Sequence, residues 1–120
     1  MTEHAWSPYD QGWYDALLDA AAMIHPFITA RGLARKLAEP PDDAALEVPG
    51  YREGYYDARL TIRCRIAAGT TIWRLSGVLL VSIRTMRCRR DNAVANLITE
   101  AEQATSMAAR NRRERGEPPW

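Results

Sequence analysis

Few residues of this chain are of the types that perform acid–base, nucleophilic or metal chemistry, and they are scattered. His4 and His25 lie far apart, and neither belongs to a pattern that would place two ligands on one helix face. Cys64 and Cys88 lack C-x-x-C spacing, so we expect reduced, buried thiols rather than a disulfide or zinc ligands. No cofactor and no metal are therefore expected, and enzymes are the least favoured class of function.

Two carboxylates, Asp15 and Asp57, occupy matching places in a repeated motif. Tyr9–Ala16 and Tyr51–Ala58 share the pattern Y-x-x-G-[WY]-Y-D-A. If the two segments meet, the carboxylates converge, and paired carboxylates can hold a metal or share a proton. We favour the simpler expectation that each accepts a hydrogen bond from a tyrosine hydroxyl or forms a salt bridge with an arginine.

The motif belongs to a longer internal similarity at an offset of 42 residues, which aligns residues 9–38 with residues 51–80. The ten identical pairs are Tyr9/Tyr51, Gly12/Gly54, Tyr14/Tyr56, Asp15/Asp57, Ala16/Ala58, Leu18/Leu60, Ile24/Ile66, Thr29/Thr71, Leu33/Leu75 and Leu37/Leu79. This similarity predicts an all-α fold: a duplicated helical hairpin with a pseudo-twofold axis, repeat units 8–39 and 50–81, and an additional C-terminal helix.

The duplication also decides between helix and strand. Residues 60–66 alternate apolar and polar side chains, which is typical of a strand, whereas the aligned residues 18–24 are rich in alanine and favour helix. We expect helices near 8–24, 27–38, 50–67, 70–89 and 92–112, forming one domain over 1–115 with a ragged tail at 116–120. The β-branched residues within 70–83 leave a small α+β fold as the alternative.

Local signals place the helix ends and the buried faces. Ser7 precedes Pro8 and Asp10 in the order of a helix N-cap, and His25-Pro26 should end the first helix. Residues 39–50 are the expected linker between the copies, since they contain several prolines. The predicted buried stripes are Tyr9, Trp13, Ala16, Ala20, Ile24 and Phe27 in the first copy, and Tyr51, Tyr55, Ala58, Ile62 and Ile66 in the second.

The glycines of the motif, Gly12 and Gly54, have two interpretations. Glycine within a helix costs about 0.5–1 kcal/mol relative to alanine, so two copies at equivalent positions imply a purpose. One interpretation is a packing joint at which two helices cross closely. The other is a paired aromatic groove that binds a partner protein, formed by Tyr9, Trp13, Tyr14, Tyr51, Tyr55 and Tyr56.

Charge is distributed unevenly along the chain. Residues 1–57 carry ten acidic and four basic residues, whereas residues 58–120 carry twelve arginines and five acidic residues. Such polarity is typical of a polyanion-binding half, but the two halves can equally complement each other. A DNA- or RNA-binding regulator is therefore the alternative function, and its candidate residues form two clusters: Arg84, Arg87, Arg89 and Arg90, then Arg110, Arg112, Arg113 and Arg115.

The repeated motif resembles helix openings in small accessory proteins of phages and other mobile elements. The resemblance covers the eight residues of each motif copy. It implies a non-catalytic regulator or inhibitor that binds and occludes a host protein complex, and it assigns no individual residue.

The expected partners are a protein and a second copy of the chain, giving a homodimer or another homo-oligomer. The last helix supplies an apolar stripe for this purpose: Val94, Leu97, Ile98, Ala101, Ala104 and Ala108. The chain begins without the pattern of a signal peptide, and its apolar runs, such as Val78 to Val81, are too short to cross a bilayer. We therefore expect a cytoplasmic protein with no membrane partner.

Overall fold

The computed structural model describes residues 6–39 and 47–116, and over these residues the chain is helical without any strand. The helices are α1 (Pro8–Met23), α2 (Ala30–Ala38), α3 (Tyr51–Ala67) and α4 (Ile72–Glu114). The all-α class is thus confirmed. The α+β alternative is wrong, because residues 60–66 lie within α3 and most of 70–83 lies within α4.

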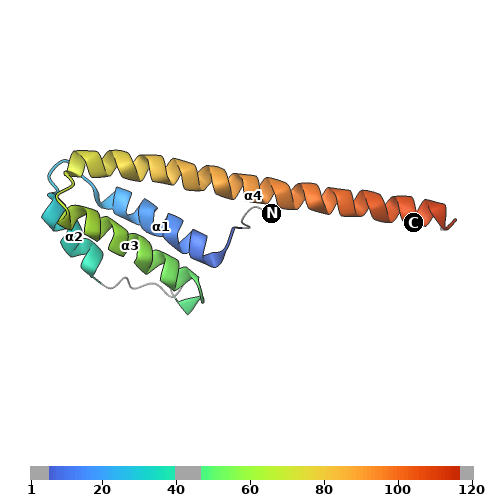
Figure 1. The fold of residues 1–120 in the computed structure, drawn as a ribbon, viewed down its shortest axis with the longest axis horizontal. Helices are drawn as coiled ribbons and strands as arrows, with labels where there is room; N and C mark the ends of the chain where they lie inside the picture. Colours follow the sequence, from blue (N-terminus) through green and yellow to red (C-terminus); the bar gives the residue numbers. More distant parts are fainter. Residues whose placement is uncertain (1–5, 40–46, 117–120) are drawn as a thin grey trace.

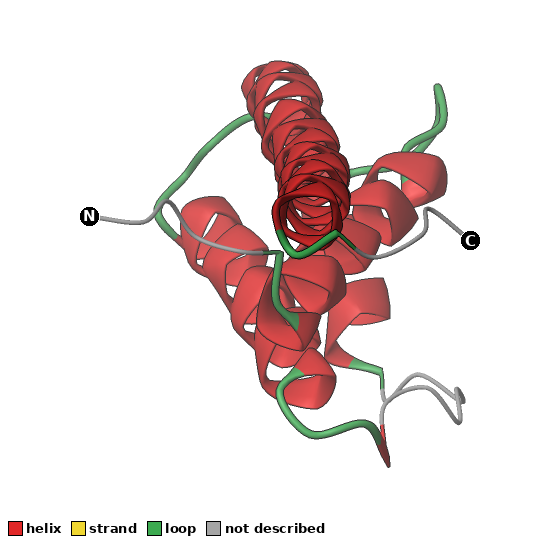
Figure 2. Cartoon of the chain, turned by 90° about the vertical axis from the view of Figure 1, so that its right-hand side faces the viewer, coloured by secondary structure: helices red, strands yellow, loops and turns green. Residues whose placement is uncertain are grey.

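Three short helices pack together, and the long α4 lies along them (Figure 1). α1 packs mainly against α3 and also against α4, while α2 packs against α3. α4 then continues well beyond the other helices, which gives the molecule extents of 70 × 28 × 26 Å. Seen from the free end of α4, the other helices lie to one side of it (Figure 2).

The helix starts follow the capping chemistry of the sequence. The Ser7 hydroxyl accepts the Asp10 backbone N–H at 3.1 Å, and the Asp10 carboxylate accepts the Ser7 backbone N–H at 3.1 Å. Thr29 and Thr71, which align at the 42-residue offset, cap α2 and α4 in the same way through their hydroxyls. Gly50 precedes α3 with a φ of 86°, a conformation that favours glycine.

α4 differs from expectation in its length. The sequence suggested separate helices near 70–89 and 92–112, but residues 90–92 continue the helix without interruption. The physical reason is that no glycine or proline occurs between residues 78 and 115, and isolated polar residues do not end a helix. The predicted C-terminal helix is therefore the distal half of α4.

The core is built from leucines that the two halves contribute at aligned positions. Leu33 and Leu75 are completely buried, and Leu37 and Leu79 nearly so. They pack with buried residues of α1 and α3, among them Tyr14, Leu17, Ala20 and Ile62. On α4 the buried residues are Leu75, Leu79, Ile83, Met86 and Ala93, and Ala93 is the last of them.

Burial corrects three expectations from the sequence. The stripe of α3 is buried except for Ile66, which is half-buried. In the first copy, Tyr9 is 37% exposed. Phe27 is 90% exposed because α1 ends at Met23, before His25-Pro26, and Phe27 lies in the following turn. Cys64 and Cys88 are free thiols as expected, yet both are exposed rather than buried. Each lies on a helix face that points away from the core, since the buried positions of α3 and α4 fall elsewhere on the helical turn.

Some expectations fall on residues that the structure does not describe: most of the linker (residues 40–46), the end of the tail (residues 117–120) and His4. Among the described residues, no helix combines the length and the apolar character needed to cross a membrane.

Candidate protein-binding surfaces

The repeated motifs meet where α1 crosses α3. A Cβ atom added at Gly12 would overlap the carbonyl oxygen of Tyr51, and one added at Gly54 would overlap the carbonyl oxygen of Tyr9. The contact is reciprocal, because each glycine lies against the first residue of the other motif. Glycine is required at both positions since the backbones approach too closely for any side chain.

The carboxylates of the motifs are acceptors for tyrosine hydroxyls at the same crossing. The Tyr9 hydroxyl donates to Asp57 at 2.7 Å, and the Tyr51 hydroxyl donates to Asp15 at 2.6 Å. The hydrogen bond to Asp57 is the main cause that raises the pKa of Tyr9. The expected tyrosine–carboxylate bonds are thus confirmed, and residues 6–39 and 47–116 contain no group of three potential metal ligands.

A buried arginine joins α3 to α1 and α2. Arg59 donates to the Tyr55 hydroxyl at 2.9 Å and to the backbone carbonyl of Glu39 at 2.9 Å, so it binds the C-terminal end of α2. Tyr55 in turn donates to Asp19 at 2.6 Å. Burial, together with the Asp19 carboxylate, raises the pKa of Tyr55 to about 12. This network stabilises the fold, since the hydroxyl of Tyr55 and one carboxylate oxygen of Asp19 are bonded within the chain. The buried Arg59 Nε has no hydrogen-bond partner among the described residues.

The six aromatic residues proposed as a groove lie mostly inside this joint. Tyr14, Tyr51 and Tyr55 are buried, Trp13 is half-buried, and Tyr9 and Tyr56 are the two exposed members. Their hydroxyls and rings largely contact one another and the carboxylates of the opposite helix. The arrangement therefore favours the packing joint over an open groove.

The first arginine cluster also serves the fold. The Arg87 Nε donates to the Tyr14 hydroxyl at 3.0 Å, and the Arg90 guanidinium lies 5.1 Å from the centre of the Tyr14 ring. Arg89 forms an ion pair with Asp10 at 3.6 Å. These three arginines attach α4 to α1, whereas Arg84 is exposed on α4. The second cluster, with Arg110, Arg112 and Arg113, lies on the exposed distal part of α4.

The bundle ends in an apolar surface that sequence reasoning missed. Trp73, in the first turn of α4, is 87% exposed, and it lines a groove of about 320 Å³ together with Ile24, Ile28 and Ile72. Phe27 lies in the α1–α2 turn and is 90% exposed; its neighbours in the chain, Pro26 and Ile28, line the groove. The signal for Trp73 was present: if Leu75 and Leu79 face the core, a residue two positions earlier must face outward. We call these five residues the apolar end: Ile24, Phe27, Ile28, Ile72 and Trp73.

The outer face of α4 extends this apolar surface. Leu80 and Val81 are exposed two turns beyond Trp73. Gly77 lies between them and Trp73, and a Cβ atom added there would meet nothing within 4 Å. A helix surface without protruding atoms at its centre and with apolar side chains on either side can accept another helix.

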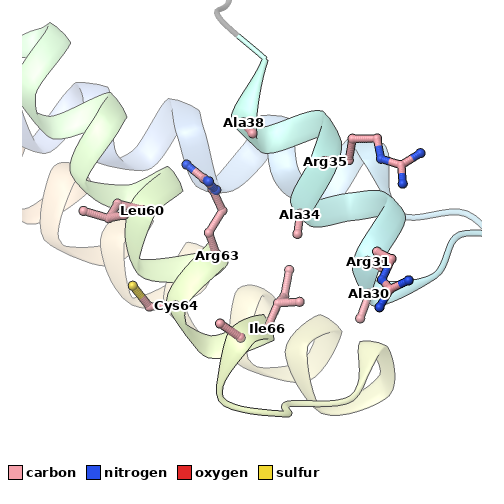
Figure 3. A pocket seen from close by; sticks show the side chains of 10 residues that line it. Ala30, Arg31, Ala34, Arg35, Ala38, Leu60, Arg63, Cys64 and Ile66 are labelled. Atoms are coloured by element: carbon pink, nitrogen blue, oxygen red, sulfur yellow. The ribbon is translucent and has the colours of Figure 1, made fainter.

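A second groove of about 730 Å³ lies between α2 and α3 (Figure 3). Small and apolar residues, including Ala34, Leu60 and Ile66, line it. Arg31 and Arg63 also belong to its lining, one from each helix. The groove is thus cationic, in contrast to the apolar end.

Beyond Ala93, every residue of α4 is exposed, and we call Val94–Glu114 the free segment. Its large apolar side chains are Val94, Leu97, Ile98 and Met107. The apolar stripe predicted for the last helix therefore exists, and no other described part of the chain covers it.

Comparison with known proteins gives no further guidance, because no protein-family model, no curated protein and no solved structure matches the chain. Its function must follow from its own surfaces.

Proposed function

We propose that the chain is a non-catalytic protein-binding module that docks a partner protein through the apolar end. The observation that carries this proposal is Trp73, which is 87% exposed and lines a groove together with Ile24, Ile28 and Ile72. Phe27, next to Ile28 in the chain, is 90% exposed. Tryptophan is among the residues most enriched at binding hot spots, where it fills or borders a desolvated pocket.

The energetics favour a partner at this surface. Covering an aromatic side chain removes roughly 150–250 Å² from water, and truncation of an aromatic residue at a binding hot spot costs about 2 kcal/mol or more. Two such rings beside a preformed groove require little reorganisation of the bundle, because Ile24, Ile28 and Ile72 already pack against the core. Rigid, preorganised surfaces bind more tightly than mobile ones of the same area.

The polar chemistry of the chain supports a non-catalytic role. Asp15, Asp19 and Asp57, which flank the contact between α1 and α3, each accept a short hydrogen bond from a tyrosine of the opposite helix. These groups are committed to holding α1 against α3. An acid or base for catalysis would have to face a cavity where a substrate could bind.

The reciprocal contacts at Gly12 and Gly54 support a duplicated hairpin with a pseudo-twofold axis as part of this proposal. The aligned threonine caps and leucines support it too. At the 42-residue offset the two grooves become counterparts, and Trp73 in the apolar end corresponds to Arg31 in the cationic groove. One copy thus carries an aromatic residue and the other a cation at the same place, so the two grooves differ in chemistry.

The resemblance of the motif to accessory proteins of phages and mobile elements suggests the class of partner. In this proposal the chain binds a host protein complex and inhibits it by occluding the surface against which the apolar end docks. Steric occlusion needs neither a cofactor nor a catalytic residue.

Affinity capture with matched variants tests the proposal. The wild-type chain and two variants, Trp73→Ala and Leu60→Ala, are immobilised and exposed to native lysate. Leu60 is the control because it is also an exposed apolar residue but lies in the other groove. We expect one protein to be retained by the wild type and Leu60→Ala and lost with Trp73→Ala. Equal retention by all three chains would refute docking at the apolar end.

Nucleic-acid binding is the competing outcome, and the exposed Arg84, Arg110, Arg112 and Arg113 are its candidate contacts. Phosphate contacts make the affinity fall steeply with salt, by roughly one power of the salt concentration for each phosphate. Fluorescence anisotropy with duplex and single-stranded probes at low and moderate salt measures this slope. Tight binding with a steep slope, together with no retained protein, would replace the proposed function with the nucleic-acid alternative.

A further inference from the structure

The free segment of α4 continues the core-facing stripe of the bundle without a change of register. Within the bundle this stripe contains Leu75, Leu79, Ile83, Met86 and Ala93, all of them buried. At 3.6 residues per turn, the same face beyond Ala93 carries Leu97, Ala101, Ala104 and Ala108. The residues that follow the buried stripe are therefore apolar but exposed.

A helix in this state lacks its main source of stability. Most helical stability in proteins comes from packing of the apolar face, and isolated helices of this length are marginal in water. Leu97 and Met107 are each 62% exposed on the free segment. Within one chain, packing against this face ends at Ala93. The same face beyond Ala93 is therefore free to pack against another helix.

We propose that a second copy of this chain covers this stripe, with the two free segments packed side by side in antiparallel orientation. The alanines at 101, 104 and 108 allow the helix backbones to approach closely, and Leu97 closes each end of the contact. This proposal goes beyond the proposed function, because it involves neither Trp73 nor the apolar end.

The bundle itself selects the antiparallel orientation. In each chain α1 packs against α4 on the same face that carries the stripe. A parallel second α4 would need the space that α1 already occupies. An antiparallel copy avoids this overlap, because the two bundles then lie at opposite ends and only the free segments meet.

Charge distribution supports a second copy as the occupant. Residues 97–102 contain two acidic residues and no base, whereas residues 110–115 contain four arginines and one acid. Of the two acids, Glu100 lies beside the stripe, and Glu102 lies on the face of Ser106. Antiparallel pairing places Ala104 opposite Ala108 of the second copy, which brings the acidic region of each chain beside the basic end of the other. The free segment is thus complementary to itself only when reversed.

Chemical crosslinking tests the orientation. In a chain whose native thiols are removed by Cys64→Ser and Cys88→Ser, a single cysteine is introduced by Met107→Cys or by Leu97→Cys. The two positions are matched, since both native side chains are 62% exposed. The proposed pairing has a twofold axis at residue 106, midway between Ala104 and Ala108. The two copies of residue 107 lie next to this axis, whereas the two copies of residue 97 lie about 27 Å apart at 1.5 Å per residue.

With a short bis-maleimide, we expect Met107→Cys to give a covalent dimer on a denaturing gel and Leu97→Cys to give no covalent dimer. Crosslinking at residue 97 as well, or at residue 97 alone, would overturn the antiparallel arrangement. Ser106→Cys lies on the opposite helix face and reports any crosslinking by random collision.

Light scattering on the intact chain tests whether the second copy binds at all. We expect a dimer for the wild type and for Ser106→Glu, and a monomer for Ala104→Glu, which places the same charge within the stripe. Because residues 104 and 106 lie beyond the bundle, circular dichroism should report an intact bundle in both variants. A monomeric wild type, or a dimeric Ala104→Glu, overturns the proposal. Trp73→Ala should remain dimeric, so the proposed function and this inference can fail separately.

Discussion

Gly12 lies directly against the backbone of Tyr51, so closely that a Cβ atom added at residue 12 would be 2.9 Å from the Tyr51 carbonyl carbon and closer still to its oxygen. The equivalent contact joins Gly54 to Tyr9. These two contacts set the separation between α1 and α3. The tyrosine–carboxylate bonds between the two helices depend on that separation.

Alanine substitution at either glycine should destabilise the bundle. Gly12→Ala must push α3 away, and such overpacking costs about 1–3 kcal/mol. Alanine gains about 1 kcal/mol in helix propensity over glycine. The overpacking cost prevails because the added atom meets backbone atoms, which cannot move aside as a side chain can. We therefore expect a lower midpoint in urea denaturation for Gly12→Ala and for Gly54→Ala. The control is Gly77→Ala, which should raise stability by about 0.5–1 kcal/mol because that position is exposed and open. A urea midpoint for Gly12→Ala that rises as it does for Gly77→Ala would contradict the close crossing of α1 and α3.

The hydroxyl of Tyr55 should make the fold sensitive to alkali. The pKa of Tyr55 is raised to about 12 in the folded chain, by burial first and then by Asp19. A raised pKa means that the folded state favours the neutral hydroxyl, so this contribution to stability is complete below pH 10 and is lost as the pH rises toward about 12. Stability measured across this range should fall less for Tyr55→Phe than for the wild type. Identical alkaline profiles would contradict the buried hydrogen bond.

Loss of Arg59 should cost more than loss of an exposed arginine from the same helix. Arg59→Met removes the donor to the backbone carbonyls of Leu37 and Glu39 and to the Tyr55 hydroxyl. A buried acceptor that loses its donor costs about 1–3 kcal/mol. Arg63→Met, on the exposed face of α3, should change the free energy of unfolding by less than about 0.5 kcal/mol. Thermal denaturation of the two variants gives this comparison. Equal midpoints would show that the Arg59 hydrogen bonds do not stabilise the fold.

Much of the fold follows from short-range signals in the sequence. Ser7, Pro8 and Asp10 predict the start of α1, and His25-Pro26 predicts its end, because capping and proline chemistry act over a few residues. The all-α class also follows from the alignment. Residues 18–24 are rich in alanine and favour helix, so the aligned residues 60–66 are expected to be helical as well.

Long-range packing decided the features that the sequence did not predict. Nothing local marks where α4 leaves the bundle, so its continuity through residues 90–92 emerges only in the structure. The exposure of Phe27 depends on where α1 ends. The exposure of Trp73 depends on which face of α4 packs against Leu33 and Leu37. Among the candidate site residues, the arginines at 87, 89 and 90 proved to bind α1, because their acceptors lie more than seventy residues away in the chain.

The most direct test of docking at the apolar end is site-specific photocrosslinking in cells. A photoreactive amino acid is introduced at residue 73 in the apolar end or, as the control, at residue 60 in the other groove. The account predicts a covalent adduct with a different protein from residue 73 and none from residue 60. An absence of adducts at residue 73, or the same adducts from both positions, would contradict it.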